Sequence, residues 1–234
     1  MSTARASATL RAGSRARGRS GVLQVLLPAA TAITLLAGSL VVLLLPLYMH
    51  PALDAAGAPR AMGLTSTEVH ALSDRTVTEL ILGPGTFAFL GPDGQLFYGS
   101  AEAEHLRDVR LVLYGFLLLG LASLTGLVVA VAKRPTDRAT WKSIARGGAG
   151  LVVALAVAAA FALLAFGAAF ELFHRLLFPG GNWSFDPATQ RLVQLYPLTF
   201  WQITAAALGL LGSVGGLVVW ALAGHRARRL AVPQ

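Results

Sequence analysis

Four long apolar stretches constrain this chain more than any other feature of its sequence. They cover residues 22–48, 109–132, 147–172 and 198–223. Each reaches the roughly 20 residues that an α-helix needs to cross about 30 Å of hydrocarbon. Hydrophobic residues form 55% of the 234-residue chain and charged residues only 13%, which is typical of a protein that lies in lipid. We therefore expect an all-α membrane protein with four transmembrane helices.

The charged residues between these stretches predict how the chain is oriented. Thirteen basic residues and one acid, Asp137, lie in three segments: 1–21, 133–146 and 224–234. The other ten acids and six arginines lie in or beside the connections 49–108 and 173–197. The positive-inside rule then places both termini in the cytoplasm and these two connections outside. Because the basic clusters lack interleaved aromatic residues, the net charge of +8 indicates contact with lipid headgroups and no nucleic-acid partner.

The stretches themselves have the composition of packing elements. None carries a charged residue or a histidine near its middle, which argues against an ion channel or a proton-coupled transporter. Small residues in the last stretch are spaced for close helix packing in lipid; they are Gly209, Gly212, Ser213 and Gly216. The chain has no cysteine, which excludes disulfides and thiol chemistry.

The external connection 49–108 is long enough to form a small cap. Residues 51–63 are rich in Pro, Ala and Gly and are interpreted as a loop. Thr65 followed by Glu68 predicts a capping box for an amphipathic helix from Ser66 to about Leu82. Residues 86–98, centred on a Gly-Pro-Asp-Gly turn, predict a β-hairpin. We therefore expect an extracytoplasmic α+β cap, followed by a helix that runs from about Ser100 into the second stretch without a break.

Two histidines lie next to the second and third stretches. His105 shortly precedes residues 109–132, and His174 shortly follows residues 147–172. Helices joined by a short connection are usually antiparallel neighbours, so both imidazoles should lie at the outer interface at similar depth. Asp108 and Glu171 are each one helical turn from a histidine and are candidates to orient the rings.

Plainer interpretations of these polar residues stay open. A histidine beside a membrane helix is commonly only a solvated residue. Asp186 before Pro187 favours a turn, with an orienting role as the less favoured reading. His50 and His70 show no partner pattern and are interpreted as surface residues. Interfacial anchoring is the preferred explanation for three aromatic residues near the fourth stretch: Tyr196, Phe200 and Trp201.

Two other kinds of site have weaker sequence support. Ser184 with His174 and Asp186 would supply the groups of a serine-hydrolase triad, but Ser184 lacks a nucleophile-elbow context. A zinc site built from His105, His174, Asp108 and Asp186 lacks the ligand spacing that zinc motifs show.

The histidine-containing segments resemble a known family. They read AEHLRDVR at residues 103–110, FHRLLF at 173–178, NWSFDP at 182–187 and LYP at 195–197. In combination they resemble the signature stretches of a bacterial four-helix membrane family, the lipoprotein intramolecular transacylases. The resemblance implies an acyltransferase that moves the sn-2 acyl chain of a diacylglyceryl lipoprotein to the amine of its N-terminal cysteine. The product would be a lyso-form lipoprotein.

The resemblance also implies a set of site residues. His105 and His174 fall on the histidines regarded as catalytic, with Asp108, Glu171 and Asp186 expected to support them. Asn182 and Trp183 are expected substrate contacts. By their own chemistry, Arg107, Arg110 and Arg175 are candidates to hold peptide carbonyls or exclude the wrong headgroup, with anchoring to lipid phosphate as an equally good alternative. An amine attacking an ester of the same molecule needs acid/base groups and positioning, so neither a metal nor a cofactor is expected.

These expectations define the partners and the place of the protein. The partners are a diacylglyceryl-modified lipoprotein and membrane lipids. The protein is expected to be multi-pass in the bacterial cell membrane, with the active site at the outer leaflet. The alternative is a non-enzymatic membrane protein whose external cap binds a lipid or a partner protein.

Overall fold

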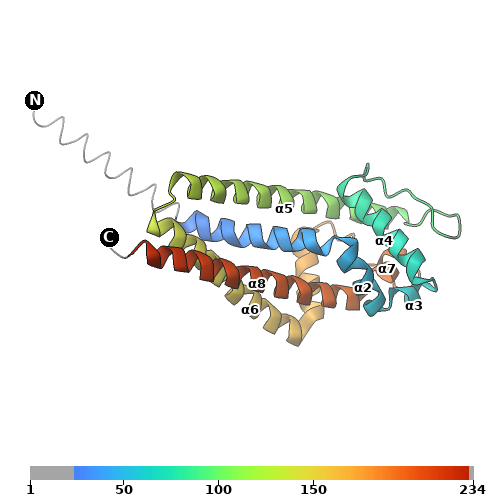
Figure 1. Ribbon diagram of the computed structural model, residues 1–234. Coiled ribbons are helices and arrows are strands. Elements are labelled where there is room, and N and C mark those ends of the chain that lie inside the picture. The colour runs from blue at the N-terminus through green and yellow to red at the C-terminus, as the bar shows by residue number, and fades with distance from the viewer. Residues whose placement is uncertain (1–23, 232–234) are drawn as a thin grey trace, which may run out of the picture. The chain divides into compact units, whose positions relative to one another are not determined.

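The computed structural model describes residues 24–231 of the chain, which are mostly helical (Figure 1). Four of the helices are long and apolar enough to cross a membrane, in agreement with the four expected spans. They are Gln24–Leu43, α5 (Ser100–Lys133), α6 (Arg138–Leu177) and α8 (Leu198–Arg229). Most of their large apolar side chains are exposed in the isolated protein, as expected of helix faces that contact lipid.

The described chain forms two compact units. One contains residues 24–36, 119–154 and 212–231, and the other contains residues 37–118 and 155–211. Both candidate histidines belong to the second unit.

Close backbone contact between glycines organises the first unit. A Cβ atom added to Gly148 of α6 would lie 2.5 Å from the carbonyl oxygen of Gly216 of α8. A Cβ atom on the neighbouring Gly147 would lie 2.6 Å from the carbonyl oxygen of Pro28. Small-residue packing is thus confirmed for Gly216, whereas Gly209 has open space around its Cα.

Four short helices build the cap of the second unit: α2 (Pro46–Ala56), α3 (Ala58–Met62), α4 (Ser66–Ile81) and α7 (Arg191–Leu195). The interpretation of residues 51–63 as a loop is therefore wrong. Gly57 and Gly63 end α2 and α3 with φ values of 76° and 65°, and α2 and α3 each have a proline in the first turn. Their first-turn prolines and terminal glycines thus mark helix starts and stops, whereas Pro51 lies inside α2. The first apolar stretch is interrupted for the same reason, since its helix ends at Leu43 and α2 begins at Pro46.

The amphipathic helix predicted after Thr65 is confirmed. α4 begins at Ser66, and the Thr65 side chain and Glu68 form the expected capping box. The hydrogen bonds from Thr65 hold the pKa of the Glu68 carboxyl below its usual range. Val69, Leu72 and Leu80 are buried on one face of α4, which packs this helix into the core of the cap.

The predicted β-hairpin is wrong, and the cap is therefore not α+β. Within residues 24–231 the segment forms no strand, only one isolated antiparallel bridge between Leu90 and Leu96. Backbone donors that a ladder would use are taken by a side chain, because Glu79 accepts hydrogen bonds from the N–H groups of Thr86 and Phe87. Phe97 and Tyr98 are also both buried, which breaks the alternation that a strand requires.

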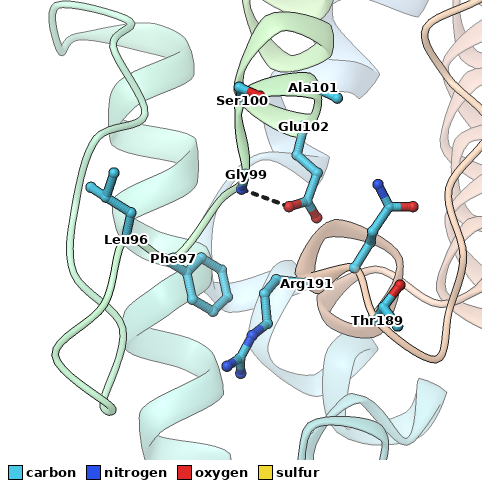
Figure 2. A pocket seen from close by; sticks show the side chains of 9 residues that line it. Leu96, Phe97, Gly99, Ser100, Ala101, Glu102, Thr189 and Arg191 are labelled. Atoms are coloured by element: carbon cyan, nitrogen blue, oxygen red, sulfur yellow. Dashed lines mark hydrogen bonds between the residues drawn. The ribbon is translucent and has the colours of Figure 1, made fainter.

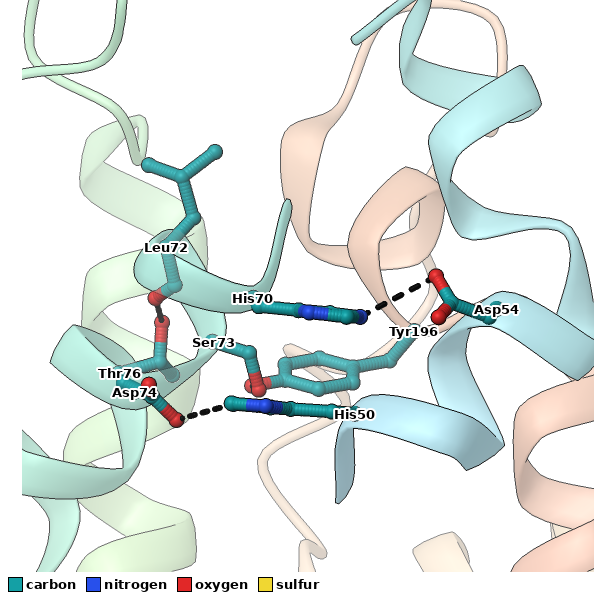
Figure 3. Close-up of polar contacts among 8 residues, drawn as sticks. All are labelled: His50, Asp54, His70, Leu72, Ser73, Asp74, Thr76 and Tyr196. Atoms are coloured by element: carbon teal, nitrogen blue, oxygen red, sulfur yellow. Dashed lines mark hydrogen bonds and ion pairs between the residues drawn. The ribbon is translucent and has the colours of Figure 1, made fainter. Parts of the chain in front are cut away.

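Buried hydroxyl groups join α4 to the rest of the cap (Figure 3). The hydroxyls of Ser73 and Tyr196 lie 3.1 Å apart, and those of Thr76 and Tyr98 lie 2.8 Å apart. Burial raises the pKa of Tyr196 to about 12, so this phenol is neutral at physiological pH. Tyr196 and Phe200 are therefore core residues of the cap, and their interpretation as interfacial anchors is wrong.

Figure 3 also shows a reciprocal arrangement of two histidines at the contact of α2 with α4. The rings of His50 and His70 are stacked with centroids 4.2 Å apart. His50 contacts Asp74 at 2.9 Å, and His70 contacts Asp54 at 3.1 Å, so each helix supplies one histidine and one carboxylate. The interpretation of these histidines as partnerless surface residues is therefore wrong.

Candidate active site

The helix that carries His105 is anchored at its first turn. α5 runs unbroken from Ser100, as the sequence predicts. Glu102, only 4% exposed, accepts hydrogen bonds from the N–H of Gly99 at 2.8 Å and from the N–H of Leu192 at 2.7 Å. This carboxylate thus joins the start of α5 to α7. The sequence analysis did not single out Glu102, although an acid in the first turn of a helix is a recognisable capping signal.

His174 lies near the end of α6, beyond a kink. Ala165 has φ −153° and ψ 56°, which are not helical values, so α6 consists of two helical segments joined at this residue. The second segment carries His174. Its ring centroid is 6.2 Å from that of His105, and the two residues are only 8% and 6% exposed. The structure therefore brings together two histidines that are 69 positions apart.

Aromatic side chains surround this pair, and we call them the aromatic cage. Phe178 lies against both rings, at 4.9 Å from His105 and 5.7 Å from His174. The remaining members pack on one histidine each: Phe170 at 4.1 Å, Trp183 at 5.1 Å and Phe173 at 5.3 Å from His174, and Phe185 at 5.5 Å from His105. Only Trp183 was singled out from sequence. The four-residue spacing of Phe170, His174 and Phe178 is the signal that indicates the others.

A backbone carbonyl determines the tautomer of neutral His174. Nδ1 lies 2.8 Å from the carbonyl oxygen of Phe170, one turn earlier in α6. Since a carbonyl oxygen only accepts, Nδ1 carries the hydrogen, and Nε2 of the neutral ring keeps its lone pair. Glu171, expected to orient this ring, instead pairs with Arg175 at 2.6 Å, and both of these side chains are exposed.

His105 has a different set of polar neighbours. The Asn182 amide donates a hydrogen bond from Nδ2 to Oδ2 of Asp108 at 2.7 Å, which leaves Asn182 Oδ1 as an acceptor. Asn182 Oδ1 and His105 Nδ1 are both buried, and neither forms a hydrogen bond within the described chain. The Asn182 side chain nevertheless lies near enough to interact with the His105 ring. Asp108, Asn182 and His105 thus form a row of polar side chains along one side of the histidine pair, which we call the polar file.

The other expected site residues lie elsewhere. Arg110 donates hydrogen bonds to the Glu79 carbonyl and to the Tyr114 hydroxyl, and Tyr114 donates to the Ile81 carbonyl, so Arg110 fastens the end of α4 to α5. Arg107 is exposed.

Asp186 has the contacts of a turn residue. Its carboxylate accepts from the N–H of Ala188 at 2.9 Å and from the hydroxyl of Thr189 at 3.2 Å. This agrees with the preferred sequence interpretation. Ser184 is exposed. Within residues 24–231, no group of three or more His, Asp or Glu side chains is arranged to hold a metal ion.

The comparisons with known proteins agree with this architecture. The chain is similar to the in meso structure of the membrane-integral lipoprotein intramolecular transacylase Lit from Bacillus cereus, with a TM-score of 0.76 and 19% identity over 91% of this chain and 97% of that chain. A structure of the same protein with a histidine-to-arginine mutation gives a TM-score of 0.72 and 17% identity, over 96% and 99% of the two chains. At these identities the likeness concerns the fold. No curated protein matches the chain.

The fold and a family match together identify the chain. Its four apolar helices and its likeness to a membrane-integral structure make it a multi-pass membrane protein. The family model described as "Lipoprotein intramolecular transacylase Lit" matches residues 26–201, well over half of the sequence. The chain therefore belongs to the lipoprotein intramolecular transacylases, a family of membrane enzymes.

Proposed function

We propose that this enzyme moves the sn-2 acyl chain of a diacylglyceryl lipoprotein to the α-amine of its N-terminal cysteine, with His105 and His174 as the acid/base pair. The observation that carries the proposal is the burial of these two imidazoles side by side, 6.2 Å apart, inside the aromatic cage. A structural role explains one buried histidine easily. Two facing histidines, each with a different Nδ1 environment, are better suited to moving a proton.

The reaction needs only proton transfer and positioning. The α-amine attacks the ester carbonyl, the new amide bond forms, and the bond from the carbonyl carbon to the glyceryl oxygen breaks. One proton leaves the nitrogen, and one proton is delivered to the glyceryl oxygen. The histidine pair accepts the first and supplies the second, so protons balance without another reactant. Because both reacting groups belong to one molecule, holding them in contact contributes much of the rate.

The polar file supports one member of the pair. Asn182 is held by Asp108, and the proposal is that its Oδ1 accepts from Nδ1–H of His105 during the reaction, because both buried atoms have no other hydrogen-bond partner within residues 24–231. That contact keeps the lone pair on Nε2 and stabilises the imidazolium that forms when the ring accepts a proton. Asp108 and Asn182 are thus proposed as positioning residues, and Trp183 as part of the wall that excludes water from His174.

The charge distribution of the sequence supports the orientation of this site. We propose that both termini lie in the cytoplasm of a bacterial cell and that the histidine pair lies at the outer leaflet. At this depth the acyl chains stay in the bilayer while the glyceryl and cysteine groups reach the imidazoles.

The test is mass spectrometry of a lipoprotein N-terminus after expression in a strain that cannot N-acylate by other routes. We expect a peptide with one acyl chain on the cysteine nitrogen and one on the glyceryl group. Recovery of only the diacylglyceryl form with a free amine from cells that contain the folded enzyme would refute the assignment.

Substitution of the histidines separates this proposal from a non-enzymatic lipid-binding role. His105→Ala and His174→Ala should each lower the rate by roughly 10²- to 10⁴-fold, the usual contribution of general acid/base catalysis. Ser184→Ala is the matched control, because Ser184 is exposed in the loop that carries Asn182 and Trp183. Persistent N-acylation in the double histidine variant would refute the dyad, and loss of activity in Ser184→Ala would favour a serine nucleophile.

A further inference from the structure

An open cavity of about 420 Å³ lies in the same unit as the histidine pair (Figure 2). Residues 96–97, 99–102 and 189–191 line it, and none of them is one of the candidate site residues. Its volume falls in the range of roughly 300–1,000 Å³ that is usual for ligand pockets.

The cavity lies one helical turn from His105. Glu102 lines the cavity and precedes His105 by three residues on the same helix. At a rise of 1.5 Å per residue, this separation is about 4.5 Å along the helix axis. Two extended residues cover this axial separation, since each spans about 3.3–3.6 Å, so we expect a chain attached to a group that reacts at this turn of α5 to approach the cavity within its first few residues.

The charged groups that line the cavity already have partners. Both oxygens of Glu102 accept backbone hydrogen bonds, and Arg191 pairs with Asp93 at 2.9 Å. A charged ligand would thus have to compete with existing ion pairs and hydrogen bonds. The remaining lining combines an exposed apolar side chain, Leu96, with the polar side chains of Ser100, Thr189 and Gln190. Such a mixture suits a neutral, polar main chain with varied side chains more than an anionic headgroup.

We infer that this cavity binds the polypeptide that follows the modified cysteine of the substrate. The inference rests on the proposed function and adds a separate subsite to it. The lipid part of the substrate lies in the bilayer, the reacting groups lie at the histidine pair, and the peptide leaves through the cavity. The first residues after the cysteine then contribute to binding.

The kinetic test compares two substrates with the same lipid. One is a diacylglyceryl cysteine amide, and the other carries four further neutral residues. Ala101→Phe places a ring in the cavity, and we expect it to raise KM for the longer substrate by about tenfold, which corresponds to about 1.4 kcal/mol of binding free energy. KM for the cysteine amide and kcat for both substrates should not change. Glu104→Phe is the control, since Glu104 is exposed on the same helix and does not line the cavity.

The inference is overturned if Ala101→Phe changes both substrates equally or neither. Thr189→Phe fills the cavity from its opposite wall and repeats the test if Ala101→Phe does not fold. Failure of the wild-type enzyme to convert either substrate would refute the proposed function instead.

Photo-crosslinking tests whether the peptide binds in the cavity without requiring catalysis. A lipopeptide with a benzophenone side chain two residues after the cysteine should label residues 96–102 or 189–191 of the full chain. Labelling only elsewhere would overturn the inference. So would labelling of the same residues by a photoreactive phospholipid headgroup that the lipopeptide does not displace, because the cavity would then be a lipid site.

Discussion

The amide of Asn182 is hydrogen-bonded to the carboxylate of Asp108 at 2.7 Å, across 74 positions of the chain. This contact joins the loop after α6 to α5, beside His105. It also gives the amide a defined orientation, because only Nδ2 can donate to a carboxylate.

Removal of this hydrogen bond should lower kcat and leave KM nearly unchanged. Asn182→Ala and Asp108→Ala each remove a hydrogen bond to a charged group, which contributes about 1.5–3 kcal/mol and corresponds to about 10- to 100-fold in kcat. KM should change little, because neither side chain is proposed to hold the substrate. The measurement is kcat and KM with a synthetic diacyl lipopeptide.

A double-substitution cycle then tests whether the two residues act together. The double alanine variant should be about as slow as the slower single variant. Additive losses would show that Asn182 and Asp108 act independently, and unchanged kcat in both single variants would exclude the polar file from the mechanism.

Glu102 should be important for stability. Gln at this position has one acceptor oxygen instead of two, so one of the N–H groups of Gly99 and Leu192 would be left unpaired in a buried site. An unsatisfied buried donor costs about 1–3 kcal/mol. Glu102→Gln should thus lower the melting temperature in detergent micelles. Glu104→Gln, on the exposed face of the same turn, should change stability by no more than about 0.5 kcal/mol.

The glycine contact of the first unit predicts different effects on stability for two nearby glycine-to-alanine substitutions. Gly148→Ala places a methyl group 2.5 Å from the Gly216 carbonyl oxygen and should destabilise the protein by about 1–3 kcal/mol. Gly150→Ala enters open space in the same helix and should be neutral or stabilising by about 0.5–1 kcal/mol. Thermal unfolding of the two variants measures the difference, and equal melting temperatures would contradict the packing described here.

The two buried tyrosines should respond differently to loss of their hydroxyls. Tyr196→Phe removes the partner of the buried Ser73 hydroxyl and should cost about 1–3 kcal/mol. Tyr98→Phe should cost less, because Thr76 still donates to the Leu72 carbonyl at 2.8 Å. Thermal melts of the two variants compare the losses directly, and a larger loss in Tyr98→Phe would contradict this reading.

Tyr196 also predicts an alkaline limit of stability. Its pKa in the folded chain is about 12, above the ordinary value of 10.0. The unfolded chain therefore loses this proton first, and the contribution of Tyr196 to stability is complete below pH 10 and falls as the pH rises towards 12. The free energy of unfolding of wild type and Tyr196→Phe is compared between pH 10 and 12. Parallel curves of stability against pH would exclude the effect.

Local signals predicted the helical elements well where no distant group competes for the backbone. The capping box of Thr65 and Glu68 involves residues three apart, and the structure contains it as expected. The hairpin failed because Glu79, several residues earlier, takes the N–H groups of Thr86 and Phe87. Prolines and glycines of residues 51–63 were interpreted as loop formers, although Pro59 lies in the first turn of α3, Gly57 and Gly63 cap α2 and α3, and Pro51 lies inside α2.

The candidate site likewise combines features that follow from local sequence or topology with features that depend on distant contacts. The approach of His105 to His174 follows from antiparallel helices and needs only topology. The Phe170 carbonyl that orients His174, the aromatic cage and the contact of Asn182 with Asp108 depend on the kink of α6 and on the path of the loop that follows it. No single periodic pattern in the sequence encodes those features.

The kink at Ala165 places the two histidines on helical segments of different length. His105 lies on a continuous helix of 34 residues, whereas His174 lies on the 12 residues of α6 that follow Ala165. Helices shorter than about 12–15 residues are marginal on their own, so this segment depends on its side-chain contacts with the cage and the loop. In hydrogen-exchange experiments the amides of residues 166–177 should exchange before those around His105. We thus expect His105 to lie in the more protected part of the fold and His174 in a segment that opens more readily.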